Sequence, residues 1–155
     1  MKKLVSIILA LAMLSSLQIF TSAEESNVTI EYDVAASFTV VIPETISVVG
    51  GKATETISVS AGSLIHADET LEITVSASAN YANGFRMVNS RKSNVFIGYS
   101  ITEGENRITL GDTLLSATAD EVFAGKETTI TITATTPTVA GTYSDVLTFS
   151  IGTVK

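Results

Sequence analysis

Residues 28–42 read VTIEYDVAASFTVVI, and this stretch decides the fold. Its even-numbered positions are all apolar or small, whereas most of its odd-numbered positions are polar. Alternation with a period of two is typical of a β-strand that buries one face. At about 3.3 Å per residue such a strand would span about 50 Å, which exceeds the ~36 Å expected across a domain of this size. We therefore expect the stretch either to bend between two sheets or to reach beyond its own domain.

The first 23 residues have the three parts of a secretory signal peptide. Lys2 and Lys3 precede a short apolar stretch, residues 4–17, and small residues follow at Thr21-Ser22-Ala23. The apolar stretch is too short for a spanning helix, and a cleavage site comes after it. We predict a signal peptide over residues 1–23 and a single domain over residues 24–155. The mature protein would be secreted or associated with the cell surface, without a membrane span; an uncleaved N-terminal anchor is the alternative.

Composition narrows the class of protein further. The chain has no cysteine, and loss of Lys2 and Lys3 with the signal leaves 7 basic against 16 acidic residues, a net charge of −9. Without cysteine, the domain has no disulfides and must be stabilised by packing and sheet hydrogen bonds. The negative charge argues against nucleic acid and anionic membrane surfaces as partners.

Strand and turn patterns continue along the rest of the mature chain. Turn signals stand at Gly50-Gly51, Asn83-Gly84 and residues 103–106, between short segments rich in Thr, Val and Ile. Strands at this spacing predict an all-β fold, an antiparallel immunoglobulin-like β-sandwich of about 7–9 strands. Residues 113–126 are the least periodic and are expected to form a loop or a single helical turn. Three tyrosines that fall in strand phase are expected in the core: Tyr32, Tyr99 and Tyr143.

Residues that carry chemistry are scarce. His66 is the single histidine, and no nucleophile-elbow motif accompanies it, so a solvated loop histidine is favoured over a hydrolase centre. One histidine without cysteine does not make a zinc site, and the scattered carboxylates lack the spacing of an EF-hand. We predict a non-enzymatic protein with no catalytic residue, no cofactor and no metal site, and the sequence leaves calcium binding in an acidic loop open.

A small group of residues is the candidate for contact with a ligand. Arg86, Arg91 and Lys92 form the only basic cluster of the mature chain, and Tyr81 lies just before it, next to Asn80. The first interpretation is that they decorate a solvated loop. The alternative is that they bind a glycan or a host protein.

The C-terminal stretch GTYSDVLTFSI, residues 141–151, resembles the closing strand of small secreted β-sandwich subunits. Examples are spore-coat-U-like pilus proteins and the related WxL-like surface proteins of Gram-positive bacteria. Residues 36–43, ASFTVVIP, are similar to the early strand of exported β-sandwich proteins. The resemblance implies an extracellular structural or adhesive subunit. In pilus-type subunits, an extended segment of one subunit fills an open groove in the next.

Two placements of the N-terminal strand remain open at this point. Val28, Ile30, Tyr32 and Val34 could fill successive pockets of a neighbouring subunit, which predicts self-association through sheet edges and filaments. Alternatively, residues 27–34 are the first strand of their own domain, which is slightly favoured because an intramolecular strand has no association cost. A monomeric extracellular binding module for a glycan or host protein is the second functional hypothesis.

Overall fold

The computed structural model describes residues 29–155, which fall into two units: residues 29–33, and a domain over residues 34–155. The predicted signal peptide, residues 1–23, and Val28 lie outside the described residues. The bounds of the strands and of the helix are β1 (Val40–Val41), β2 (Lys52–Val59), β3 (Thr70–Ser78), β4 (Phe85–Asn89), β5 (Lys92–Glu103), β6 (Asn106–Ile108), β7 (Thr113–Thr118), α2 (Ala119–Ala124), β8 (Glu127–Ala134), β9 (Tyr143–Ser144) and β10 (Leu147–Val154).

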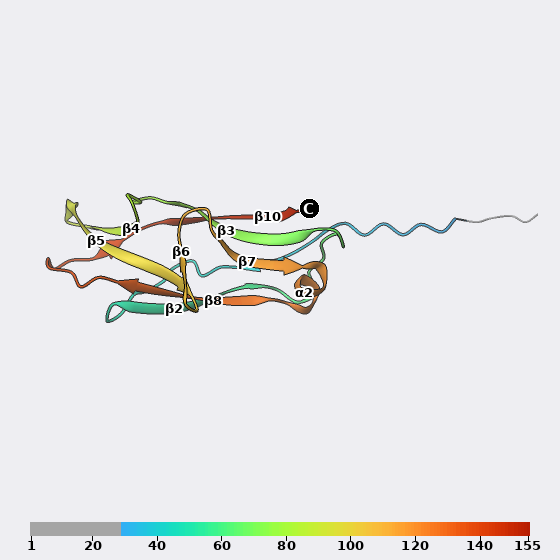
Figure 1. Cartoon of the computed structure of the whole chain (residues 1–155), viewed down its shortest axis with the longest axis horizontal. Helices are drawn as coiled ribbons and strands as arrows, with labels where there is room; N and C mark the ends of the chain where they lie inside the picture. Colours follow the sequence, from blue (N-terminus) through green and yellow to red (C-terminus); the bar gives the residue numbers. More distant parts are fainter. Residues whose placement is uncertain (1–28) are drawn as a thin grey trace, which may run out of the picture. The chain divides into compact units, whose positions relative to one another are not determined.

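The strands form two antiparallel sheets that pack face to face. The larger sheet has the order β1-β2-β8-β5-β4-β9, with β6 also paired to β5, and the smaller has the order β10-β3-β7. Figure 1 shows β10, β3 and β7 side by side in one layer, with β2 and β8 in the other. The predicted antiparallel, immunoglobulin-like β-sandwich is confirmed.

The core lies between the sheets and follows the period-two pattern. On β3, Leu71, Ile73 and Val75 are fully buried, while Glu72 and Thr74 between them are half-buried. The larger sheet contributes Ile101 of β5 and other side chains of the same face, which complete one contiguous apolar cluster. Stiff β-branched side chains fill these positions well because they pack tightly on a pleated surface.

The N-terminal stretch departs from the expected first strand. Residues 29–36 belong to no strand; Ser37 forms an isolated bridge with Leu64, and only Val40–Val41 pairs with β2. The prediction that residues 27–34 are a strand of their own domain is therefore wrong for the part that the structure describes. Tyr32 is also not a core residue, because its side chain is 91% exposed. Tyr99 is buried as predicted and Tyr143 is half-buried.

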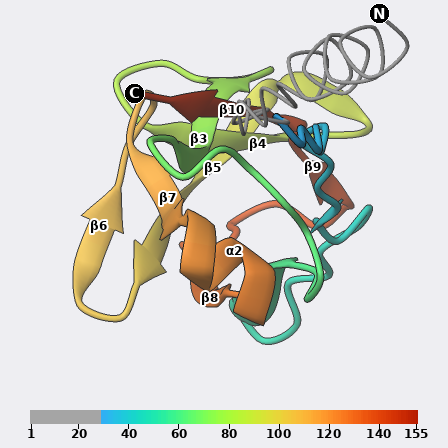
Figure 2. The same ribbon diagram turned by 90° about the vertical axis from the view of Figure 1, so that its right-hand side faces the viewer.

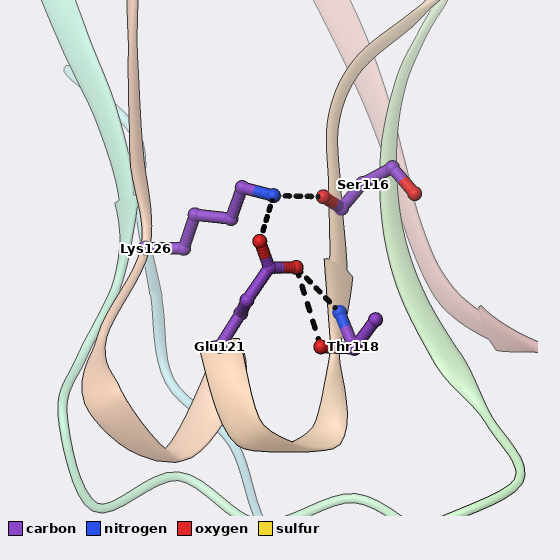
Figure 3. A network of polar contacts seen from close by, with 4 residues as sticks. All are labelled: Ser116, Thr118, Glu121 and Lys126. Carbon is purple, nitrogen blue, oxygen red and sulfur yellow. Dashed lines mark hydrogen bonds and ion pairs between the residues drawn. The ribbon is translucent and has the colours of Figure 1, made fainter.

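Residues 113–126 contain more structure than their weak periodicity suggested. They form strand β7 followed by the six-residue helix α2, which closes one end of the domain between β7 and β8 (Figure 2). Val122 of α2 is fully buried. The Glu121 carboxylate accepts hydrogen bonds from the Thr118 backbone N–H (2.9 Å) and from Lys126 Nζ (2.8 Å) (Figure 3). Lys126 Nζ also donates to the Ser116 carbonyl at 2.7 Å, which ties the end of the helix back to β7.

Candidate functional site

The inner face of the smaller sheet is covered unevenly. Ile151 of β10 pairs with Ile73 of β3, and Phe149 pairs with Val75. Cross-strand partners point to the same face of a sheet, so all four side chains face the interior. Ile73 and Val75 are fully buried, whereas Ile151 is 42% exposed and Phe149 is half-buried. The inner face of β10 is therefore covered less completely by the larger sheet than the inner face of β3.

β10 is also the edge strand of its sheet. Among residues 29–155, β3 is the only strand that pairs with β10, so its outer backbone edge is left without a strand partner. Its inner-face side chains are apolar at Leu147, Phe149 and Ile151. An unpaired edge with apolar side chains is a template on which an additional strand can pair.

A groove of about 1180 Å³ opens beside this edge. Apolar side chains from both sheets line it: Met87 and Ile97 from the larger sheet, Leu147 and Phe149 from the smaller. These four side chains are half-buried. Residues 43–48, which precede β2, complete the lining of the groove.

The start of β10 is fixed by a polar network around one carboxylate. Asp145 accepts hydrogen bonds from the hydroxyls of Ser78 and Tyr99, each at 2.6 Å, and from the Asn80 backbone N–H and Nδ2, each at 3.0 Å. Burial raises the pKa of Asp145, but the hydrogen bonds outweigh it and hold the pKa below its ordinary value. Burial, together with this carboxylate, raises the pKa of Tyr99. The network connects the segment just before β10 to β3 and β5, and so to both sheets, and Asp145 and Tyr99 also line the groove.

The residues predicted to donate a strand are exposed. Ile30 and Tyr32 are 90% and 91% exposed, and Val34 is 46% exposed. The alternation of these residues implies that one face is buried, but at such exposures their large apolar side chains are mostly unpacked. Their placement in a partner remains a prediction.

The predicted ligand contacts divide into two groups. Tyr81 packs edge-on against Phe85, with ring centroids 5.3 Å apart, and Arg86 donates from Nε to the Asn80 carbonyl at 2.8 Å. Arg91 and Lys92 lie at the other end of β4, in and just after the turn to β5. The structure therefore brings Tyr81 and Arg86 to one end of β4 and does not unite them with Arg91 and Lys92.

Sequence reasoning missed Asp145 and the role of the β10 edge. A signal for Asp145 was present, because it occupies the inward phase of the closing strand between Tyr143 and Leu147. An ionisable residue in that phase indicates a buried hydrogen-bond network. The missing cover beside β10 has no local signal, since it depends on how many strands reach each sheet.

His66 lies in an exposed loop, as the favoured interpretation of this residue expected. In residues 29–155, no group of three His, Cys, Asp or Glu side chains is placed to hold a metal ion. The described part of the chain also has no helix that is long and apolar enough to cross a membrane.

No family model matches this chain, and no curated protein matches it. Solved structures do match. One is a chain from the crystal structure of the CsuC–CsuE chaperone–tip adhesion subunit pre-assembly complex, from archaic chaperone-usher Csu pili of Acinetobacter baumannii. It is 13% identical with a TM-score of 0.55, and the match covers 76% of this chain and 40% of that chain.

A second match comes from a chaperone–tip adhesin complex of CFA/I fimbriae biogenesis. It is 12% identical with a TM-score of 0.52, and the match covers 77% of this chain and 42% of that chain. This chain therefore spans less than half the length of either matched chain. At such identities the similarity shows the fold alone, an immunoglobulin-like sandwich of the kind found in pilus chaperone–adhesin complexes.

Proposed function

We propose that this chain is a secreted, non-enzymatic subunit of a cell-surface filament, with a structural or adhesive role. In this proposal it assembles by donating residues 28–34 to the groove and the β10 edge of a neighbouring copy. The contrast between buried Ile73 and exposed Ile151, on one face of one sheet, carries the proposal. A missing strand beside β10 accounts for that contrast.

The pattern of side chains in the N-terminal segment suits an added strand at the unpaired edge of β10. Ile30, Tyr32 and Val34 alternate with polar residues, so one face of an added strand would present apolar side chains to the groove. Full burial contributes about 1.5–3 kcal/mol for each such side chain, against an association cost of about 4–15 kcal/mol. Side chains alone would make a weak complex, so the hydrogen bonds of the β10 ladder must supply the remainder.

The route of the chain favours a neighbour as the acceptor. Residues 37–42 are anchored near the end of β2 that lies by α2, through Ser37 to Leu64 and Val40 to Val59. Residues 43–48 and 50–52, which follow this anchor along the chain, line the groove. To fill its own groove, the segment that precedes the anchor would therefore have to fold back alongside residues 37–42. A second copy needs no such reversal.

The structures that match come from complexes of a chaperone with a pilus tip subunit. That class of protein is compatible with a pilus-type or fimbrial role for this chain. A chaperone that covers the β10 edge before assembly is a partner of the same chemistry, since it would also supply an extended apolar strand.

The test compares the mature chain with a variant that lacks residues 24–34. We expect SDS- or heat-resistant oligomers of the mature chain, which the deletion abolishes, as measured by mass in solution and by gel. Thr29→Ser and Glu31→Gln, on the polar face of the segment, are the matched controls and should still assemble. A mature chain that stays monomeric at high concentration, or a deletion variant that oligomerises equally well, would contradict the proposal.

A further inference from the structure

A second hollow, of about 490 Å³, is lined by residues of β4, β5, β6 and β8 of the larger sheet and adjoins the β10 groove at the end of β8. β4 and β6 both pair with one edge of β5, because β8 occupies its other edge at residues 99–103. The hollow lies where β4 and β6 meet along that edge. Arg86 stands opposite Gly98, and Arg107 stands opposite Thr102. These positions alternate with buried Tyr99 and Ile101, so they face outward.

Gly98 forms the floor of the hollow. It interrupts the middle of β5, where a side chain would ordinarily stand, and its φ lies outside the left-handed range, so the backbone does not require glycine. A Cβ there would meet Phe85 O and Thr135 Cγ2 at 4.0 Å, which is ordinary contact. A glycine that the backbone does not need marks a place where another molecule can approach the strand closely.

The hollow carries positive charge that no carboxylate of the described residues neutralises. Arg86 and Arg107 both line it, and no carboxylate of residues 29–155 lies within 4.0 Å of either guanidinium, since the ion pairs of that part involve Lys126 and Lys155. Arg86 is held in place by its Nε hydrogen bond to Asn80 and by Phe96, whose ring centroid is 4.3 Å from Cζ. The Nη groups of Arg86 have no protein acceptor in this part of the chain. A positioned guanidinium of this kind is suited to bind a carboxylate through two hydrogen bonds.

Three hydroxyl side chains also line the hollow, from Ser100, Thr133 and Thr135, and the Thr135 hydroxyl donates to the Gly98 carbonyl at 3.1 Å. Hydroxyls beside guanidinium groups match a ligand that carries both a carboxylate and several hydroxyl groups. We propose that this hollow binds a carboxylate-bearing sugar, with the positioned Arg86 guanidinium on the carboxylate and Arg107 and the hydroxyl side chains on the ring. The hollow adjoins the groove at Tyr99 and residues 133–135, which line both, whereas Arg86 and Arg107 line the hollow alone.

The test measures binding of glucuronate and of glucose to the mature chain by titration calorimetry. We expect glucuronate to bind and glucose not to. Arg86→Gln and Arg107→Gln should each weaken glucuronate binding by roughly tenfold or more, because each removes a charge-assisted hydrogen bond. Arg91→Gln, at the other end of β4, is the matched control and should bind as the parent does. Gly98→Val should weaken binding by placing an isopropyl group inside the hollow, while leaving the thermal unfolding of the domain nearly unchanged.

Several outcomes would contradict the proposed binding site. If glucose and glucuronate bound equally well, the two arginines would have no role in binding. If acetate bound as tightly as glucuronate, the sugar ring would contribute nothing. Tighter binding of a triglutamate peptide than of glucuronate would point to an acidic protein instead. Undiminished binding in Gly98→Val would place the ligand elsewhere, and the unfolding curve of that variant shows whether it is folded.

Discussion

Asp145 shows how a single side chain fixes the closing strand. Its carboxylate collects donors from Ser78, Asn80 and Tyr99, which come from the end of β3, from the segment that follows β3 and from β5. Hydrogen bonds to a charged group contribute about 1.5–3 kcal/mol each when buried, and less when the group is partly solvated, as this one is. The network therefore sets the position from which β10 begins to line the groove.

The first prediction concerns the acid stability of this network. Because the folded-state pKa of Asp145 lies below its ordinary value of 3.8, the carboxylate stabilises the fold above that value. The stabilisation is lost as the pH falls through the folded-state pKa. Asp145→Asn should lower the free energy of unfolding by about 1–3 kcal/mol at neutral pH and show a smaller further loss in acid. Urea unfolding at several pH values measures both effects, with Glu105→Gln in an exposed turn as control; equal acid sensitivity of parent and Asp145→Asn would refute the prediction.

The second prediction separates backbone strain from a steric clash. Gly141 and Gly84 share a φ of 151°, but a Cβ on Gly141 would collide with the side chain of Asn89, which is 2% exposed, whereas a Cβ on Gly84 meets open space. Gly141→Ala should therefore be less stable than Gly84→Ala by about 1–3 kcal/mol, the usual cost of overpacking a buried site. Denaturant unfolding of the two variants gives the difference directly. Equal losses would mean that strain alone is responsible.

At the scale of elements, the sequence predicted best those strands whose partners lie in the same domain. On β3, β5 and β8 the buried residues follow the period-two pattern, because one face is buried and the other is not. The pattern in residues 28–34 has the same form, yet the structure leaves residues 29–36 unpaired. Periodicity records that a face is to be buried but does not record against which chain. Arg107 was missed for a related reason, since only the pairing of β6 with β5 brings it to Arg86.

The third prediction uses the unequal cover of β3 and β10. In the variant without residues 24–34, Ile73→Ala should cost about 2–5 kcal/mol of unfolding free energy, as for a fully buried isoleucine. Ile151→Ala should cost less, about 1 kcal/mol, because its side chain is already 42% exposed. In the mature chain, Ile151→Ala should in addition weaken the oligomers, as measured by the temperature at which they dissociate in SDS. Equal costs for the two substitutions in the monomer would mean that β10 is covered in solution.

The whole molecule combines an exposed apolar segment at one end of the chain with an uncovered strip beside β10, near the other end. Each copy would then be both donor and acceptor, which is the heterologous contact that generates open filaments instead of closed rings. The acidic charge of the chain opposes non-specific association, so a specific strand contact is the one that would persist. Filament growth in this scheme needs both halves of the contact on every copy.

The fourth prediction follows from that requirement. A variant without residues 24–34 keeps the acceptor but has no donor, and Ile151→Arg keeps the donor but places a charge on the acceptor strip, where burial is costly. Each variant alone should be monomeric, whereas an equimolar mixture should form a heterodimer that grows no further, because neither end of the pair can add another copy. Native mass spectrometry distinguishes these states. Separate monomers in the mixture would contradict donation of the N-terminal segment, and oligomers of Ile151→Arg alone would place the acceptor at a site other than β10.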